Sequence, residues 1–217
     1  MIITPFKHRF DNLKARGQHI NYVLDIGAYR GDFTETIKSI WPNAIVWQFE
    51  ADQRQKPWLN ATAIYALLGD QERARVDYYT LSEDKITTGS SIFRELTNHY
   101  TDETTVVMPL EMTTLDKLSE THNFYGNWAS QGLVKIDTQG SELLILSGAQ
   151  KFLNYKKPKF ILLECSIMPY NQGAPSFYDT VSAMHNYSYK VNDVFDLNYD
   201  QRGALLQTDI LFERIDK

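Results

Sequence analysis

Hydrophobic positions follow two different spacings along this chain. Short runs of branched and aromatic residues, typical of buried strands, occur at 22–26, 44–49, 63–68, 132–137 and 159–164. Other segments carry apolar residues three or four positions apart and predict amphipathic helices at 32–41, 113–120, 141–153 and 176–187. A short helix over 52–60 is weaker because Pro57 lies inside it.

The order of these elements predicts the fold class. Strands that alternate with helices indicate an α/β protein with a largely parallel, Rossmann-like sheet covered on both faces. Further strands are expected at 75–81 and 105–110, and an antiparallel hairpin at 189–195 and 208–215 closes the sheet. Right-handed crossovers place every strand-to-helix turn on one sheet edge, where ligands bind. We expect one domain over residues 1–217.

Composition narrows the class of protein. The chain has 217 residues with 43% hydrophobic residues and a net charge of -5, and its basic residues form no block, so nucleic acid is not an expected partner. Cys165 is the one cysteine, which excludes an intrachain disulfide. No apolar run approaches the roughly 18 residues of a membrane span. We therefore expect a cytoplasmic protein. No spacing of Cys, His, Asp or Glu residues demands a metal site, and no pattern in the sequence indicates an oligomeric state.

The stretch YVLDIGAYRGDF, residues 22–33, leads from a strand through Gly27 and Gly31 into a helix. Such a turn can bind a dinucleotide pyrophosphate at the helix N-terminus, and Glu50 lies 19 residues further on, where dinucleotide-binding domains keep a ribose-binding acid. The dinucleotide fingerprint, however, is G-x-G-x-x-G, whereas this turn reads G-x-x-x-G with Asp25 ahead of it. A carboxylate beside a pyrophosphate would be repulsive.

S-adenosylmethionine removes this conflict, because it has no phosphate and carries an ammonium and a sulfonium that a carboxylate favours. Gly27 and Gly31 would let the backbone approach the methionine part, and Glu50 could accept hydrogen bonds from both ribose hydroxyls. Asp70, in LLGD, is placed to meet the adenine edge. The alternative for the glycines is a tight strand-to-helix turn without a ligand.

A second acidic motif, VKIDTQGSELLILSGA, ends a strand at Asp137. Its acids lie on the same sheet edge as Asp25. Asp137 is the candidate general base for a hydroxyl, and its alternatives are a helix cap or a contact to the cofactor ammonium. Glu142, in the first helical turn, fits a partner of the helix dipole better than a catalyst. Glu164 ends the next strand and could face the substrate.

Together with FEAD, ALLGD, TTGSS and ILLE, these motifs resemble the FkbM-type family of S-adenosylmethionine-dependent methyltransferases, over residues 23–164. The resemblance implies a seven-stranded class I methyltransferase fold and methyl transfer to oxygen, usually a hydroxyl of a sugar or polyketide-type metabolite. The cofactor-binding residues that it implies are Asp25, Gly27, Ala28, Gly31 and Glu50, with Ala51 beside the ribose acid. The second motif carries onto Asp137, Gly140 and Glu142.

Three residues depart from the family pattern: Tyr29 replaces asparagine, Ala51 replaces proline, and Gln139 replaces an acid. The sequence therefore predicts an S-adenosylmethionine-dependent O-methyltransferase acting on a small molecule, sugar or glycan precursor. The alternatives are an NAD(P)-dependent oxidoreductase and a non-catalytic module that holds S-adenosylmethionine or a nucleoside. Acceptor contacts are expected from loops 82–104, 121–131 and 165–175, and His99 is a reserve base.

Overall fold

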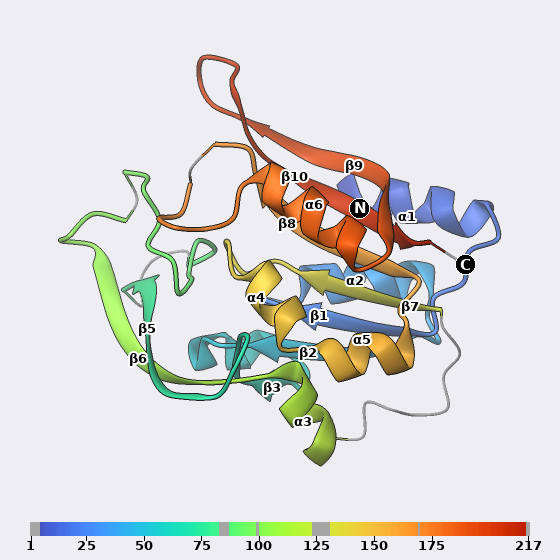
Figure 1. Ribbon diagram of the computed structural model, residues 1–217, viewed down its shortest axis with the longest axis horizontal. Coiled ribbons are helices and arrows are strands. Elements are labelled where there is room, and N and C mark those ends of the chain that lie inside the picture. The colour runs from blue at the N-terminus through green and yellow to red at the C-terminus, as the bar shows by residue number, and fades with distance from the viewer. Residues whose placement is uncertain (1–4, 83–86, 99, 123–130, 169, 216–217) are drawn as a thin grey trace.

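The computed structural model describes residues 5–82, 87–98, 100–122, 131–168 and 170–215 (Figure 1). Its main sheet has seven strands in the order β3-β2-β1-β7-β8-β10-β9. The strands β3, β2, β1, β7 and β8 run parallel, and β10 is antiparallel to both β8 and β9. The bounds are β1 Tyr22–Ile26, β2 Ile45–Glu50, β3 Ile64–Tyr65, β7 Gly132–Ile136, β8 Phe160–Ser166, β9 Tyr189–Tyr199 and β10 Leu205–Arg214. The mostly parallel sheet and its C-terminal hairpin are confirmed.

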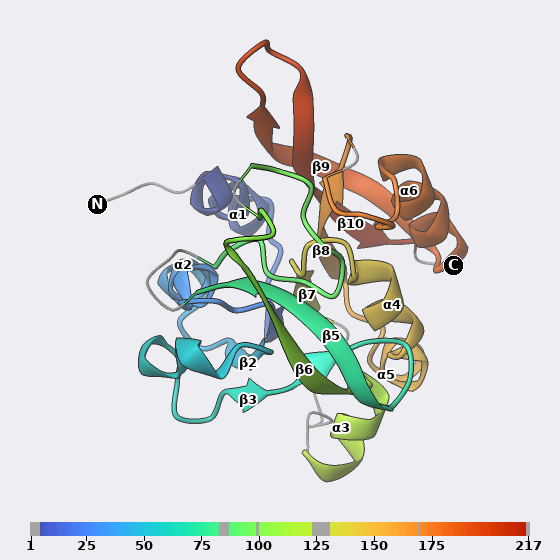
Figure 2. The same ribbon diagram turned by 90° about the vertical axis from the view of Figure 1, so that its left-hand side faces the viewer.

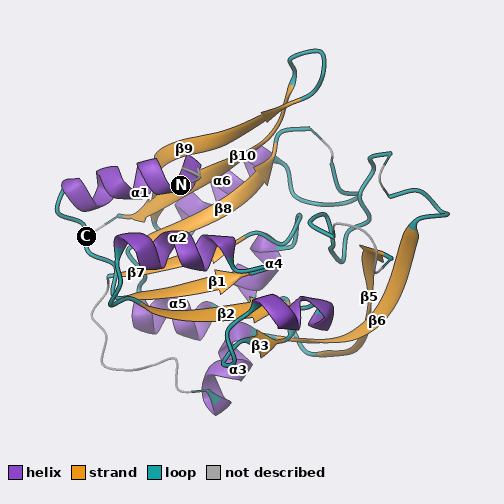
Figure 3. Ribbon diagram, turned by 180° about the vertical axis from the view of Figure 1, so that it is seen from behind, coloured by secondary structure: helices purple, strands orange, loops and turns teal. Residues whose placement is uncertain are grey.

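Helices cover both faces of this sheet. The helices α1 (Pro5–Ala15) and α2 (Asp32–Ile40) lie on one face, and α4 (Glu142–Ser147), α5 (Gln150–Lys156) and α6 (Phe177–Asn186) lie on the other (Figures 1 and 3). Successive strand residues point to opposite faces, so Val23 packs with the α2 residue Phe33 and Leu24 packs with the α5 residue Phe152. No helix in the described part of the chain has the length and apolar character needed to cross a membrane.

Two predicted elements are divided in the structure. The helix expected over 141–153 forms as α4 and α5, with Gly148 and Ala149 between them. The backbone of Gly148 lies so close to another loop that a Cβ there would be 2.0 Å from the Gly69 carbonyl oxygen. The strand expected over 63–68 forms as β3 and β4 (Leu67–Leu68), which belong to different sheets. The periodicity located these segments, and tertiary contacts set where they break.

A second sheet of three strands was not predicted. It has the order β4-β6-β5, and its strands β5 (Arg73–Leu81) and β6 (Thr105–Thr113) pair in antiparallel register. These two strands form a long curved ribbon beside the main sheet, with α3 (Leu115–Thr121) following β6 (Figures 1 and 2). The strands expected at 75–81 and 105–110 are confirmed, but their place outside the main sheet is a finding of the structure.

The N-terminal helix α1 was also missed. Phe10 is fully buried, and its ring makes edge contacts with Phe33, Trp41 and Phe195 at centroid distances of 5.9, 6.0 and 6.2 Å. Leu13 lies in the same cluster. The apolar spacing of Phe6, Phe10 and Leu13 is helical, and this signal could have located the element.

We predict that Phe10→Ala lowers the free energy of unfolding by about 3–5 kcal/mol, because it leaves a cavity between α1, α2 and β9. Urea denaturation measures this change. The matched control is His8→Ala, which alters an exposed residue of the same helix and should change stability by less than about 0.5 kcal/mol. A Phe10→Ala loss as small as the control would contradict the packing of α1.

Candidate active site

A cavity of about 830 Å³ lies at the carboxyl ends of the parallel strands. Many of the residues that line it come from the turns after β1, β2 and β7 and from β8, as expected for an open α/β sheet. They include Gly27, Ala28, Tyr29, Glu50, Ala51, Asp52, Lys135, Asp137, Gln139 and Glu164. The structure thus brings most of the predicted site residues to one place.

The turn after β1 is held tightly against its neighbours. The amides of Gly27 and Ala28 both donate to the Phe49 carbonyl oxygen at 3.0 Å. Gly27 has a φ of 75°, and a Cβ on it would lie 1.9 Å from the Asp137 carbonyl oxygen. Gly27 is therefore required by this close approach as well as by the left-handed backbone. Tyr29 is also left-handed, with a φ of 48°, which suits the asparagine of the family pattern better than tyrosine.

Asp25 lies behind this turn. Its side chain is 0% exposed, and Asp25 is not among the described residues that line the cavity. Its Oδ2 accepts a hydrogen bond of 2.7 Å from Thr34, and its Oδ1 lies 3.4 Å from Lys135 Nζ. Burial raises the pKa of Asp25, and Lys135 opposes that shift. Asp25 was expected beside the bound cofactor, but the structure places it behind the turn and away from the cavity wall, so its carboxylate would not stand next to a pyrophosphate either.

Lys135 is a functional candidate that the sequence reasoning missed. Its Nζ donates to the Gly27 carbonyl oxygen at 2.9 Å and lies 3.3 Å from Asp137 Oδ2. Burial alone would lower the pKa of Lys135, but the carboxylates of Asp137 and Asp25 outweigh burial and raise it above its ordinary value. The available signal was a lysine inside the otherwise apolar strand GLVKI.

Glu50 is buried at the end of β2 and lines the cavity. Its Oε2 accepts from the Tyr29 amide and its Oε1 from the Asp52 amide, both at 2.8 Å. Burial raises the pKa of Glu50 in spite of these two bonds. The two amides fix the plane of the carboxylate, and each of its oxygens keeps a further lone pair for a ligand.

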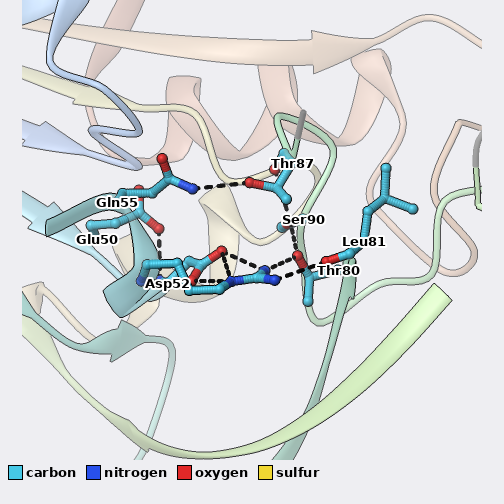
Figure 4. Close-up of polar contacts among 8 residues, drawn as sticks. Glu50, Asp52, Gln55, Thr80, Leu81, Thr87 and Ser90 are labelled. Atoms are coloured by element: carbon cyan, nitrogen blue, oxygen red, sulfur yellow. Dashed lines mark hydrogen bonds and ion pairs between the residues drawn. The ribbon is translucent and has the colours of Figure 1, made fainter. Parts of the chain in front are cut away.

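A polar network that includes Asp52, Thr80 and Ser90 supports the next part of the wall (Figure 4). Arg54 lies in the 3-10 turn η1 (Gln53–Trp58), and its guanidinium pairs with Asp52 at 2.6 Å. It also donates to Thr80 Oγ1 at 2.7 Å and to the Leu81 carbonyl oxygen at 2.9 Å. Thr80 in turn is 2.7 Å from Ser90 Oγ. This network joins the β2 turn to β5 and to the segment 87–91.

The same segment is also fixed to the opposite wall. Ser91 Oγ donates to the Gln139 carbonyl oxygen at 2.9 Å. Gln139 Nε2 donates to Asp137 Oδ1 at 3.3 Å and to Glu164 Oε2 at 2.5 Å, and Gln207 donates to Glu164 Oε1 at 2.6 Å. Burial raises the pKa of Glu164 well above its usual range, and nearby Asp137 adds to this shift. Gln139, noted only as a departure from the family pattern, thus links the two carboxylates.

Glu142 is turned away from the cavity. It is buried and not among the described lining residues, and its Oε1 accepts from the Thr138 amide at 2.9 Å and the Gly140 amide at 3.1 Å. These bonds support the expected role at the start of a helix. Burial raises the pKa of Glu142 to about 7.

Other candidates lie outside the cavity or outside the described residues. Asp70 pairs with Arg73 at 2.9 Å and, like Gly31, is not among the described residues that line the cavity.

The loops that were expected to contact the acceptor contribute lining residues to the cavity, which are Thr87–Ile92, Glu95, Tyr100 and Tyr170. His99 and residues 123–130 lie outside the described residues. Within the described ranges, no group of three or more His, Cys, Asp or Glu residues is arranged to hold a metal.

The sheet order and the position of the cavity define the class I methyltransferase fold, which solved structures share. An FkbM methyltransferase from Methylobacillus flagellatus KT has a TM-score of 0.51 and 14% identity, over 88% of this chain and 43% of that chain. An O-methyltransferase from Bacillus cereus, solved in complex with S-adenosylhomocysteine, has a TM-score of 0.50 and 12% identity, over 98% of this chain and 83% of that chain. This chain thus spans less than half the length of the Methylobacillus protein.

The family model described as the methyltransferase FkbM domain matches residues 25–191. The chain therefore belongs to the FkbM family of S-adenosylmethionine-dependent methyltransferases. No curated protein matches the chain significantly in sequence.

We predict that Glu142 makes the protein less stable as the pH rises from about 4.5 to 7. Its folded-state pKa is about 7 against an ordinary 4.5, so the folded protein binds the proton more tightly than the unfolded chain in this window. Glu142→Gln removes this dependence, and its stability relative to wild type should grow by roughly 3 kcal/mol across the window. Urea unfolding at several pH values measures the difference.

The matched control for this experiment is Glu111→Gln, which changes an exposed glutamate in β6. Its stability difference from wild type should stay constant across the same pH range. A constant difference for Glu142→Gln would contradict the raised pKa.

Proposed function

We propose that this chain transfers a methyl group from S-adenosylmethionine to a hydroxyl oxygen of a small molecule, sugar or glycan precursor. The observation that carries the proposal is the carboxylate of Asp137, whose side chain is 35% exposed at the cavity wall. It lies on the same sheet edge as Glu50, the candidate ribose ligand. A proton acceptor and a cofactor site therefore share one cavity.

The lining residues fit this cofactor. The cavity of about 830 Å³ lies within the roughly 300–1,000 Å³ of ligand pockets, and carboxylates along its wall complement an ammonium and a sulfonium. Gly27 and Ala28 would hold the methionine part, and Glu50 and Ala51 the ribose. When bound, the cofactor supplies a methyl group that its sulfonium already activates.

The chain itself has to orient the hydroxyl and remove its proton. Asp137 would accept this proton as the oxygen becomes nucleophilic, a contribution of about 10²- to 10⁴-fold. Two side chains hold its carboxylate, because Lys135 lies beside Oδ2 and Gln139 donates to Oδ1. The segment 87–92 lines the cavity and is bonded to both walls, so it is placed to limit the access of water.

The alternatives are less well supported. A module that only binds the cofactor would be supported if Asp137 and Glu164 pointed away from the cavity, but both residues line it. An NAD(P)-dependent oxidoreductase is disfavoured by membership in a methyltransferase family and by the turn G-x-x-x-G at residues 27–31, which lacks the dinucleotide fingerprint.

The first experiment is isothermal titration of the protein with S-adenosylhomocysteine and, in parallel, with NAD and NADP. We expect binding of S-adenosylhomocysteine alone. Transfer of radioactive methyl from S-adenosylmethionine to a panel of hydroxylated acceptors then tests the chemistry. Binding of a dinucleotide instead would refute the proposal.

We predict that Glu50→Ala weakens the affinity for S-adenosylhomocysteine by about 10- to 100-fold, because a charged hydrogen-bond acceptor for the ribose is lost. Titration calorimetry measures the dissociation constant, and circular dichroism checks the fold. Glu111→Ala, which removes an exposed glutamate, is the control and should bind as wild type does. Unchanged affinity in Glu50→Ala would remove Glu50 from the cofactor site.

We predict that Asp137→Asn keeps its affinity for S-adenosylhomocysteine and loses about 10²- to 10⁴-fold in methyl transfer, because asparagine cannot accept the proton. Calorimetry and the radioactive transfer assay measure the two quantities separately. Asp77→Asn, at an exposed position of β5, is the matched control. Full transfer activity in Asp137→Asn would exclude it as the base.

A further inference from the structure

We propose that Lys135 is the positioning residue that joins the cofactor turn to the acidic turn, and that Asp25 influences the cofactor only through Lys135. This inference rests on the proposed function, which assigns the cofactor to the cavity at these turns. It gives Asp25 a different role from the direct contact that its place in the sequence indicated.

Lys135 Nζ meets oxygens from three different segments. It lies 3.4 Å from Asp25 Oδ1 in β1, 2.9 Å from the Gly27 carbonyl oxygen in the next turn, and 3.3 Å from Asp137 Oδ2 after β7. The ring of Phe33 covers the ammonium at 5.6 Å. Only 8% of the Lys135 side chain is exposed, so water contributes little to the surroundings of the ammonium. The three protein oxygens therefore determine where the ammonium lies.

Asp25 and Lys135 depend on each other. Asp25 Oδ1 is buried and accepts no hydrogen bond within the described structure, so the nearby ammonium is what compensates its charge. A buried carboxylate without a partner is costly, and removing one member of a buried pair leaves the other unpaired. Because Asp25 is 0% exposed, it can act on a ligand in the cavity only through its neighbours.

The ammonium controls two parts of the site at once. Its bond to the Gly27 carbonyl fixes the peptide that precedes Ala28, at the cavity wall. Its ion pair with Asp137 sets one oxygen of the candidate base, while Gln139 sets the other. Lys135 is not itself a base, because its carboxylate neighbours keep its pKa raised and its amine protonated.

A double-mutant cycle tests the inference with S-adenosylhomocysteine as the probe. The dissociation constant is measured by calorimetry for wild type, Lys135→Met, Asp25→Asn and the double variant. We expect Lys135→Met to weaken binding by about tenfold or more, and the double variant to bind about as weakly as Lys135→Met alone. If the losses of the two single variants multiply in the double variant, Asp25 acts independently and the inference is overturned.

A matched control separates this effect from the general loss of a buried lysine. Lys156→Met changes a buried lysine at the end of α5 that is not among the described lining residues. It should bind S-adenosylhomocysteine as wild type does. Wild-type affinity in a folded Lys135→Met variant would also overturn the inference.

A second measurement avoids variants that fail to fold. The side-chain ammonium of Lys135 in wild-type protein labelled with ¹⁵N should exchange slowly with water, and its resonance should shift when S-adenosylhomocysteine binds. A resonance unchanged at saturation would refute the link to the cofactor turn. Wild-type protein that binds no S-adenosylhomocysteine would refute the proposed function instead, so the two failures are distinguishable.

Discussion

A buried ammonium constrains the centre of this molecule. Lys135 sits in a central strand of the sheet, and its charge must be matched by oxygens that the fold brings to it. Asp25 supplies a carboxylate from the neighbouring strand β1, Asp137 supplies one from the turn just after Lys135's own strand β7, and the Gly27 carbonyl supplies the third oxygen. The turn at Gly27 must then pass so close to Asp137 that no side chain fits there. Electrostatic matching and steric fit therefore specify the same local geometry.

Around this centre, the cavity has two kinds of wall. The turns after β1, β2 and β7 form the first wall on the ends of a rigid parallel sheet. The second wall comes from the segment 87–92 and from Tyr170, which lie in irregular structure. Side-chain hydrogen bonds hold this segment in place: Ser90 bonds to Thr80, which itself accepts from Arg54, and Ser91 donates to the Gln139 carbonyl oxygen on the other side.

Much of the fold followed from the sequence, since the strand and helix periods located the main sheet and its order of elements. Gly27 and Glu50 do line the cavity, and the sequence located them because each ends or follows a strand that reads clearly. Long-range effects were not predictable. Nothing local in VLDIG shows that Asp25 faces Lys135 rather than a ligand, and the period of a strand does not show which of two sheets it joins. The role of Arg54 was missed because two of its partners, Thr80 and Leu81, lie 26 and 27 positions further along the chain.

The ribbon of β5 and β6 leaves and rejoins the rest of the chain at adjacent points. Leu68 pairs with Thr113, and the Gly69 amide donates to the Thr113 carbonyl oxygen at 2.9 Å. The intervening excursion is thus a closed loop whose length does not affect the spacing of the main sheet, and loop-closure entropy grows only slowly with length. Insertions or deletions within it can remodel one wall of the cavity while the other keeps its geometry.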